Sequence, residues 1–160
     1  GNFDGLDKNK STLIISPEAS FSLGTNLDSN SFASYAKSYL EKNGYRNIKS
    51  YTVAKNISSA DSSTIINEAK SYDQIVVAMS NVKTSNYSRT ISFVNSLASL
   101  NKKLVVIALE TPYDIMAYSD NVETYICCYS YQEVSCKALA RYLSGEFEAQ
   151  GVLPITEGLK

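Results

Sequence analysis

The chain has 160 residues, of which 44% are hydrophobic and 19% charged, a size and composition that suit one globular domain with its own core. Its formal net charge of -1 gives no electrostatic reason to expect nucleic acid or a membrane surface as a partner, and we expect neither. No apolar run approaches the roughly 20 residues that span a bilayer, so we expect a soluble chain. Because the sequence begins at Gly1 rather than at methionine, we interpret it as an expressed or excised fragment, so any signal peptide of a parent would lie outside it.

Five segments have the sequence pattern of β-strands. The runs at 11–16, 74–79 and 104–109 are continuously apolar at their centres, as strands that are covered on both faces require. The segment 48–53 alternates weakly between apolar and polar residues, and 123–129 carries Ile126 and two cysteines at its centre.

Apolar residues at helical spacing predict four helices between and after these strands. Asn43-Gly44 provides a left-handed stop for the first helix, and Gly145 ends the last one. The second helix should begin within the cluster 59–62, whose side-chain oxygens can cap free amide groups. The residues expected to face inward are, helix by helix, Phe32, Tyr35, Ala36, Tyr39 and Leu40; Ile65, Ile66, Ala69 and Tyr72; Ile91, Val94, Leu97 and Ala98; and Val134, Ala138, Leu139, Tyr142 and Leu143.

Strands that alternate with helices of about 10 to 15 residues indicate βαβ units, whose right-handed crossovers place helices on both faces of a parallel sheet. The sequence therefore predicts a three-layer α/β/α sandwich with a mainly parallel sheet of five or six strands in the flavodoxin-like order 2-1-3-4-5. We expect residues 1–10 to be a linker or an expression remnant, 11–156 to form the domain and 157–160 to be a tail.

Two capping boxes are predicted in the last third of the chain. In the first, Thr111 caps a short helix, Pro112 takes the first helical position, and Asp114 reaches back to the cap as the third residue. The segment 130–133, Ser-Tyr-Gln-Glu, has the same pattern and should start the last long helix.

Four motifs follow one another in this part of the chain: Thr111-Pro112-Tyr113-Asp114, Tyr129-Ser130, Gly145-Glu146 and Gly151-Val152-Leu153-Pro154-Ile155-Thr156. Their order resembles the second domain of glycoside hydrolase family 3, in the branch of the β-N-acetylglucosaminidases. That domain carries Asn-Pro-Tyr-Asp after a strand, a Tyr-Ser step into a helix, Gly-Glu, and then Gly-x-Leu-Pro before a β-branched residue. Threonine stands here in place of the usual asparagine, and both residues can cap a helix.

The resemblance implies a parent enzyme in which a TIM barrel precedes this domain and hydrolyses N-acetylglucosaminides of cell walls or related glycans. It also implies that the catalytic aspartate and histidine lie on the barrel. This chain contains no histidine, so we expect a non-catalytic accessory domain whose partners are the barrel of the same parent and, through it, a carbohydrate. The resemblance slightly favours a secreted or cell-envelope parent. The alternative is a free-standing flavodoxin-like module that binds a small ligand or a protein at the carboxyl edge of the sheet.

Four residues are candidates for contact with the substrate or the barrel: Glu18, Glu110, Tyr113 and Asp114. Glu110 and Asp114 follow a strand at the edge where parallel sheets bind ligands, and two carboxyl groups about 5 to 5.5 Å apart would suit a retaining glycosidase. The capping box already explains Asp114, so we favour a cap and a solvated glutamate over a catalytic pair. For Glu18 we favour a solvated loop carboxylate.

Other kinds of site have weaker support. The first strand runs into Pro-Glu-Ala-Ser rather than a glycine-rich phosphate turn, so we expect no nucleotide or flavin cofactor. A phosphoacceptor receiver needs acidic residues where Ser16-Pro17 and Ser80-Asn81 stand. Adjacent Cys127 and Cys128 would point to opposite faces of a strand, which favours buried, inert thiols over a metal site. Tyr113, Tyr118 and Tyr131, near the strand ends, are the tyrosines that could contact a sugar.

Overall fold

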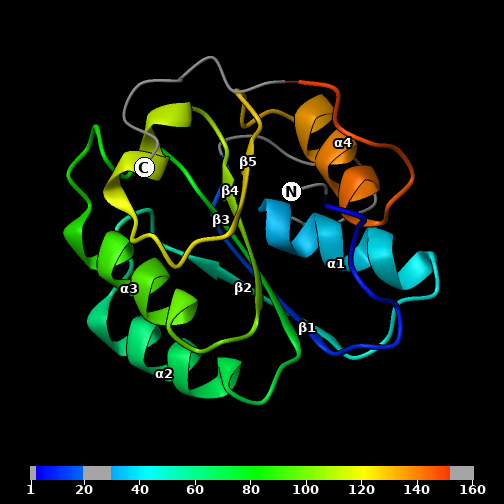
Figure 1. Ribbon diagram of the computed structural model, residues 1–160, viewed down its shortest axis with the longest axis horizontal. Helices are drawn as coiled ribbons and strands as arrows, with labels where there is room; N and C mark the ends of the chain where they lie inside the picture. Colours follow the sequence, from blue (N-terminus) through cyan, green and yellow to red (C-terminus); the bar gives the residue numbers. More distant parts are fainter. Residues whose placement is uncertain (1–2, 20–29, 152–160) are drawn as a thin grey trace.

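The computed structural model describes residues 3–19 and 30–151, which fold around one sheet of five parallel strands (Figure 1). The strand order is β2-β1-β3-β4-β5, and every neighbouring pair is parallel. This confirms the flavodoxin-like order and, within the described part of the chain, the lower of the two expected strand numbers. The strands are β1 Thr12–Pro17, β2 Ile48–Val53, β3 Gln74–Met79, β4 Lys103–Ala108 and β5 Thr124–Cys127.

Helices cover both faces of the sheet, as the alternation of segments predicts. The pair α1 and α4 lies on one face and the pair α2 and α3 on the other (Figure 1). A short 3-10 helix, η1, connects β4 to β5. The helices are α1 Phe32–Lys42, α2 Ser59–Ala69, α3 Ser88–Ala98, η1 Pro112–Ala117 and α4 Glu133–Leu143. None of them is long and apolar enough to cross a lipid bilayer, as far as the structure describes the chain.

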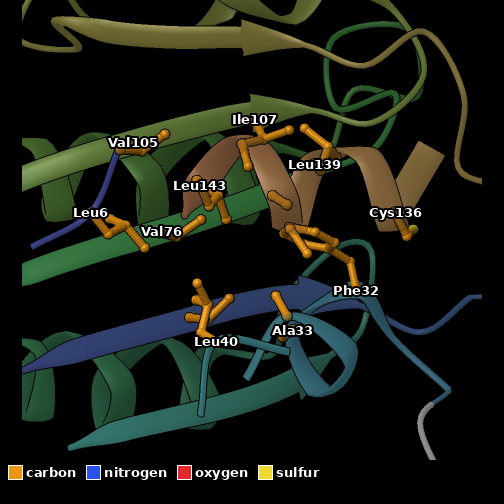
Figure 2. Packing of buried hydrophobic residues seen from close by; sticks show 14 of the residues in the cluster. Leu6, Phe32, Ala33, Leu40, Val76, Val105, Ile107, Cys136, Leu139 and Leu143 are labelled. Atoms are coloured by element: carbon orange, nitrogen blue, oxygen red, sulfur yellow. The ribbon is translucent and has the colours of Figure 1, made fainter. Parts of the chain in front are cut away.

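Two hydrophobic clusters, one on each face of the sheet, make up the core. Successive strand residues point to opposite faces, so Ile14 of β1 joins one cluster while Leu13 and Ile15 join the other. Figure 2 shows the first cluster, in which Phe32 and Leu40 from α1 and Leu143 from α4 lie against the sheet. Strands β1 and β3 are buried along their whole length, which explains their continuous apolar runs.

The start and inner face of α4 differ from the prediction. Gln132 is the N-cap and makes no side-chain capping bond, so the expected capping box that begins at Ser130 is wrong. The buried residues are Cys136, Leu139, Ala140 and Leu143, whereas Val134 is 71% exposed and Ala138 is exposed too. Val134 and Ala138 lie four residues apart and so share one face of the helix, which is turned to solvent.

Other helix ends agree more closely with the sequence. Ser58, one residue before the expected cluster, caps α2 by accepting from the amide of Asp61. Gly44 and Gly145 have φ of 89° and 77°, which confirms them as left-handed stops. Three predicted segments lie wholly or mostly outside the described residues: the extended segment after Gly151, the tail 157–160 and the loop 17–31. The division of the chain at residues 10 and 156 stays a prediction.

Candidate functional site

A hollow of about 660 Å³ lies at the carboxyl edge of the sheet, where β1 and β2 end. Ligands bind at this edge in open parallel sheets. Two of the predicted residues, Glu18 and Glu110, line the hollow, whereas Tyr113 and Asp114 are not part of its lining. The full lining is Glu18, Ala19, Thr52, Val53, Ala54, Lys55, Glu110 and Tyr131. The sequence did not lead us to predict Thr52 or Lys55 as lining residues. Their positions at and just after the end of the predicted strand 48–53, where parallel sheets bind ligands, could have indicated them.

Glu110 is exposed, but its carboxylate is already held by the loop that follows β3. One carboxylate oxygen accepts hydrogen bonds from the Ser80 hydroxyl and from the side-chain amide of Asn81, the latter at 2.6 Å. Asn81 itself has a left-handed backbone with φ of 54°. Glu110 therefore fastens the end of β3 to the end of β4 while facing the hollow.

Asp114 does not complete the predicted capping box, and that part of the prediction is wrong. Its side chain is fully buried, and Oδ1 accepts from the backbone amide of Lys83 at 3.1 Å, in the loop after β3. Oδ2 has no hydrogen-bond partner among the described residues. Burial raises the pKa of Asp114. The expected cap by Thr111 is confirmed, because its hydroxyl accepts from the Tyr113 amide at 3.3 Å.

Glu110 and Asp114 thus hold one loop from two sides. Each accepts hydrogen bonds from residues 80–83, so both carboxylates already have structural partners. A general acid or nucleophile must instead reach the reacting atoms of a substrate. Asp114 is thus not the expected cap, and the exposed Glu110 carboxylate is held by Ser80 and Asn81. That the two residues are not a catalytic pair stays a prediction. Contact of Glu18, Glu110, Tyr113 or Asp114 with a carbohydrate or a barrel stays a prediction.

The first turn of α1 lies beside the hollow, and its amide groups are occupied by the protein's own hydroxyls. The Phe32 amide donates to the Tyr131 hydroxyl at 3.0 Å, and the Ala33 amide donates to the Ser16 hydroxyl at 2.8 Å. The Ser34 amide donates to the Ser31 hydroxyl at 3.2 Å. These are the groups that bind phosphate in nucleotide-binding sheets. The closed turn is consistent with the absence of a glycine-rich motif after β1.

Of the three tyrosines near the strand ends, Tyr113 is the most exposed, at 54%. Tyr118 packs against Tyr125, with 6.4 Å between the ring centroids. Tyr131 lines the hollow, but its hydroxyl donates to the Pro17 carbonyl while accepting from the Phe32 amide. The Tyr131 ring therefore belongs to the structure that fixes α1 against β1.

The cysteines lie in surroundings that disfavour the reactive thiolate. Cys136 is buried, and Cys127 and Cys128 are partly buried. Burial raises the pKa of Cys127 to about 11 and that of Cys136 to about 12. Within the ranges that the structure describes, no group of three potential ligands could hold a metal ion.

The Gly-Glu motif that supports the family resemblance has a structural role here. The Glu146 carboxylate accepts from the Tyr39 hydroxyl on α1, from Arg141 Nε at 2.8 Å and from the Ser144 hydroxyl at 3.0 Å. The hydrogen bond from Tyr39 contributes most to lowering the pKa of Glu146, which falls to about 2. Glu146 therefore joins the C-terminal end of α4 to α1, which the sequence pattern did not reveal.

No model of a known protein family matches this chain, and no curated protein matches it. Solved structures do contain the fold. It is similar to part of a glycoside hydrolase family 3 β-N-acetylglucosaminidase from Paenibacillus sp. str. FPU-7, with a TM-score of 0.77 and 24% sequence identity. That alignment covers 96% of this chain and 28% of the other.

A second similar structure is described as a fungal multi-domain family 3 β-N-acetylglucosaminidase with a GCN5-related glucosamine N-acetyltransferase region. Its TM-score is 0.70 at 20% identity, and the alignment covers 94% of this chain and 16% of the fungal one. This chain therefore spans about a quarter of the bacterial chain and a sixth of the fungal one. At these identities the two structures establish the doubly wound α/β fold of the domain.

Proposed function

We propose that this chain is a non-catalytic accessory domain of a glycoside hydrolase family 3 β-N-acetylglucosaminidase. In this role it packs beside a TIM barrel that hydrolyses N-acetylglucosaminides, and it stabilises or shapes that barrel. The observation that carries the proposal is the likeness of almost the whole chain to a minor part of two such enzymes. The four motifs found in the sequence give independent support.

The side chains of the domain support an accessory role. The sequence has no histidine, the residue that the resemblance places on the barrel as part of the acid/base pair. Glu110 and Asp114 are engaged in holding the loop after β3. The first turn of α1 is closed by hydroxyl groups, which leaves no free amides there for an anionic ligand.

An activity assay and the parent gene together test this proposal. The 160-residue chain should release no product from a chromogenic N-acetylglucosaminide, and Glu110→Gln should leave that result unchanged. Turnover by the chain that is abolished in Glu110→Gln would contradict the accessory role. The gene sequence upstream of Gly1 should encode a barrel, and its absence would remove the proposed partner.

The hollow at the carboxyl edge favours a second candidate, a free-standing module that binds a small ligand. Its lining combines two carboxylates, the Lys55 ammonium group and the Thr52 hydroxyl, which suits a polar ligand. Titration with N-acetylglucosamine, followed by the NMR shifts of Thr52 and Lys55, separates the two candidates. Saturable shifts in a chain whose gene encodes no barrel would favour the module.

A further inference from the structure

Residues 3–7, which precede the sheet, are bound to the domain along their whole length. The Leu6 amide donates to the Leu143 carbonyl at 2.8 Å, and the Tyr45 hydroxyl donates to the Leu6 carbonyl at 3.0 Å. Leu6 is only 6% exposed and belongs to the core cluster shared by α1 and α4. In Figure 1 this dark-blue segment runs beside the C-terminal end of α4.

Polar contacts to the starts of two strands fix the same segment on its other side. The buried Gln74 side chain accepts from the Asp7 amide at 3.0 Å and donates to the Asp7 carbonyl at 2.8 Å. Lys103 Nζ donates to the Gly5 carbonyl at 2.8 Å and lies 5.4 Å from the centre of the Phe3 ring. The Phe3 ring in turn lies 5.4 Å from that of Tyr142 on α4.

The closest approach is between two glycines. Gly5 has φ of 92°, and a Cβ atom there would lie 2.9 Å from both Cα and N of Gly145. Side chains do not tolerate such distances, and left-handed φ values also favour glycine. Only glycine at position 5 lets the segment cross the end of α4 this closely. Contacts of this number and closeness are not those of a flexible linker, which leaves its backbone solvated.

We propose that residues 3–7 form a fixed joint, which holds this domain in one orientation relative to the polypeptide that precedes it. The joint lies at the amino edge of the sheet, where β3 and β4 begin and α4 ends, opposite the hollow at the carboxyl edge. Under the proposed function that polypeptide is the barrel, so both the presence and the identity of the partner rest on the proposed function. The packing of residues 3–7 on the domain follows from the contacts of the described residues.

Amide hydrogen exchange in two glycine variants tests the joint. Gly5→Ala introduces the clash with Gly145, whereas Gly44→Ala is the matched control, because Gly44 has φ of 89° and nothing within 4 Å of an added Cβ. We expect the Leu6 and Asp7 amides to exchange roughly 10- to 100-fold faster in Gly5→Ala than in the unaltered chain. Gly44→Ala should leave their exchange unchanged, and the Ile14 amide in β1 should stay protected in all three proteins.

A milder variant covers the case in which Gly5→Ala fails to fold. Lys103 is exposed, and Lys103→Met removes its hydrogen bond to the Gly5 carbonyl. This variant should speed amide exchange at Leu6 by a smaller factor than Gly5→Ala does. Fast amide exchange at Leu6 in the unaltered chain, or equal exchange at Leu6 and Asp7 in all variants, would contradict the proposal of a fixed joint. Neither result depends on hydrolase activity or on the upstream gene, so it is distinguishable from failure of the proposed function.

Orientation is measured with a small globular reporter domain fused directly before Phe3. With a fixed joint, ¹⁵N relaxation should give one rotational correlation time for the reporter and the domain in the unaltered and Gly44→Ala proteins. In Gly5→Ala the reporter should tumble separately and faster. Separate tumbling of the reporter in the unaltered protein would show that residues 3–7 do not fix orientation.

Discussion

The buried carboxyl group of Asp114 gives a pH-dependent prediction. Burial raises its pKa, so the folded state binds this proton more tightly than the unfolded state does. The resulting contribution to stability is fully present below the unfolded-state pKa of about 4, and it is lost as pH rises through the folded-state pKa. Asp114→Asn keeps an oxygen that can accept from the Lys83 amide and removes this ionisation. We expect the stability of Asp114→Asn relative to the unaltered protein to increase as pH rises above about 4.

Urea unfolding at several pH values measures this difference. Asp120→Asn, at an exposed position, controls for the change in net charge. Asp114→Ala should cost about 2 kcal/mol at neutral pH, because it leaves a buried backbone amide without its acceptor. A difference between Asn and Asp at position 114 that is constant with pH would contradict the effect of burial.

Tyr131 and Tyr113 lie near the same edge of the sheet but should respond differently to loss of the hydroxyl group. The Tyr131 hydroxyl joins the Phe32 amide to the Pro17 carbonyl, so Tyr131→Phe removes a hydrogen-bond partner from a backbone group of each of these two buried residues. We expect it to lower the free energy of unfolding by roughly 1 to 3 kcal/mol. Tyr113→Phe, at a side chain that is 54% exposed, should change stability by less than about 0.5 kcal/mol. Thermal unfolding compares the two, and equal losses would exclude the role given to Tyr131.

At the scale of helices and strands, substitutions at two helix caps should change the stability of the protein in opposite directions. Ser58 caps α2 through its hydroxyl, whereas Gln132 caps α4 with an extended backbone, φ of -122°, and no side-chain bond. Gln132→Ser should therefore stabilise the protein by about 0.5 to 1 kcal/mol, and Ser58→Ala should destabilise it by about 1 kcal/mol. Denaturant midpoints give both values. Loss of stability in Gln132→Ser would show that Gln132 has a role beyond the start of the helix.

The strands were predictable because their signal is local. Continuous apolar runs marked β1, β3 and β4, and the alternation with helices then indicated a parallel sheet with right-handed crossovers. The start of α4 was not predictable, because Ser130 is the better cap residue in the sequence, whereas the helix begins after Gln132. The structure selects the later start, with Tyr129 at φ of 61° and Tyr131 bound to α1 between β5 and the helix.

The candidate site was predicted only in part, for a related reason. Position after a strand was enough to bring Glu18 and Glu110 to one hollow. Asp114 and Glu146 each have a partner in a distant element, Lys83 and Tyr39, which lie 31 and 107 residues away in the chain. A capping box relates residues three apart, so this reasoning assigned Asp114 to its own turn. Tertiary hydrogen bonds of this kind leave no periodic pattern in a sequence.

At the scale of the whole molecule, the two clusters on opposite faces of the sheet should unfold as one unit. They share strands, because Ile14 of β1 belongs to one cluster and Leu13 and Ile15 to the other. Phe32 is fully buried in the first cluster and Phe93 is 1% exposed in the second. Truncating either side chain to alanine should cost about 3 to 5 kcal/mol through lost burial and a residual cavity.

The decisive measurement is the number of unfolding transitions in each variant. If the sheet couples its two faces, Phe32→Ala and Phe93→Ala should each move a single transition to lower temperature, with circular dichroism and tyrosine fluorescence coinciding. A variant in which one transition moves while another stays at the original temperature would show that the faces unfold separately. The matched pair is informative because each phenylalanine reports on one face, while the shared strands are unchanged in both variants.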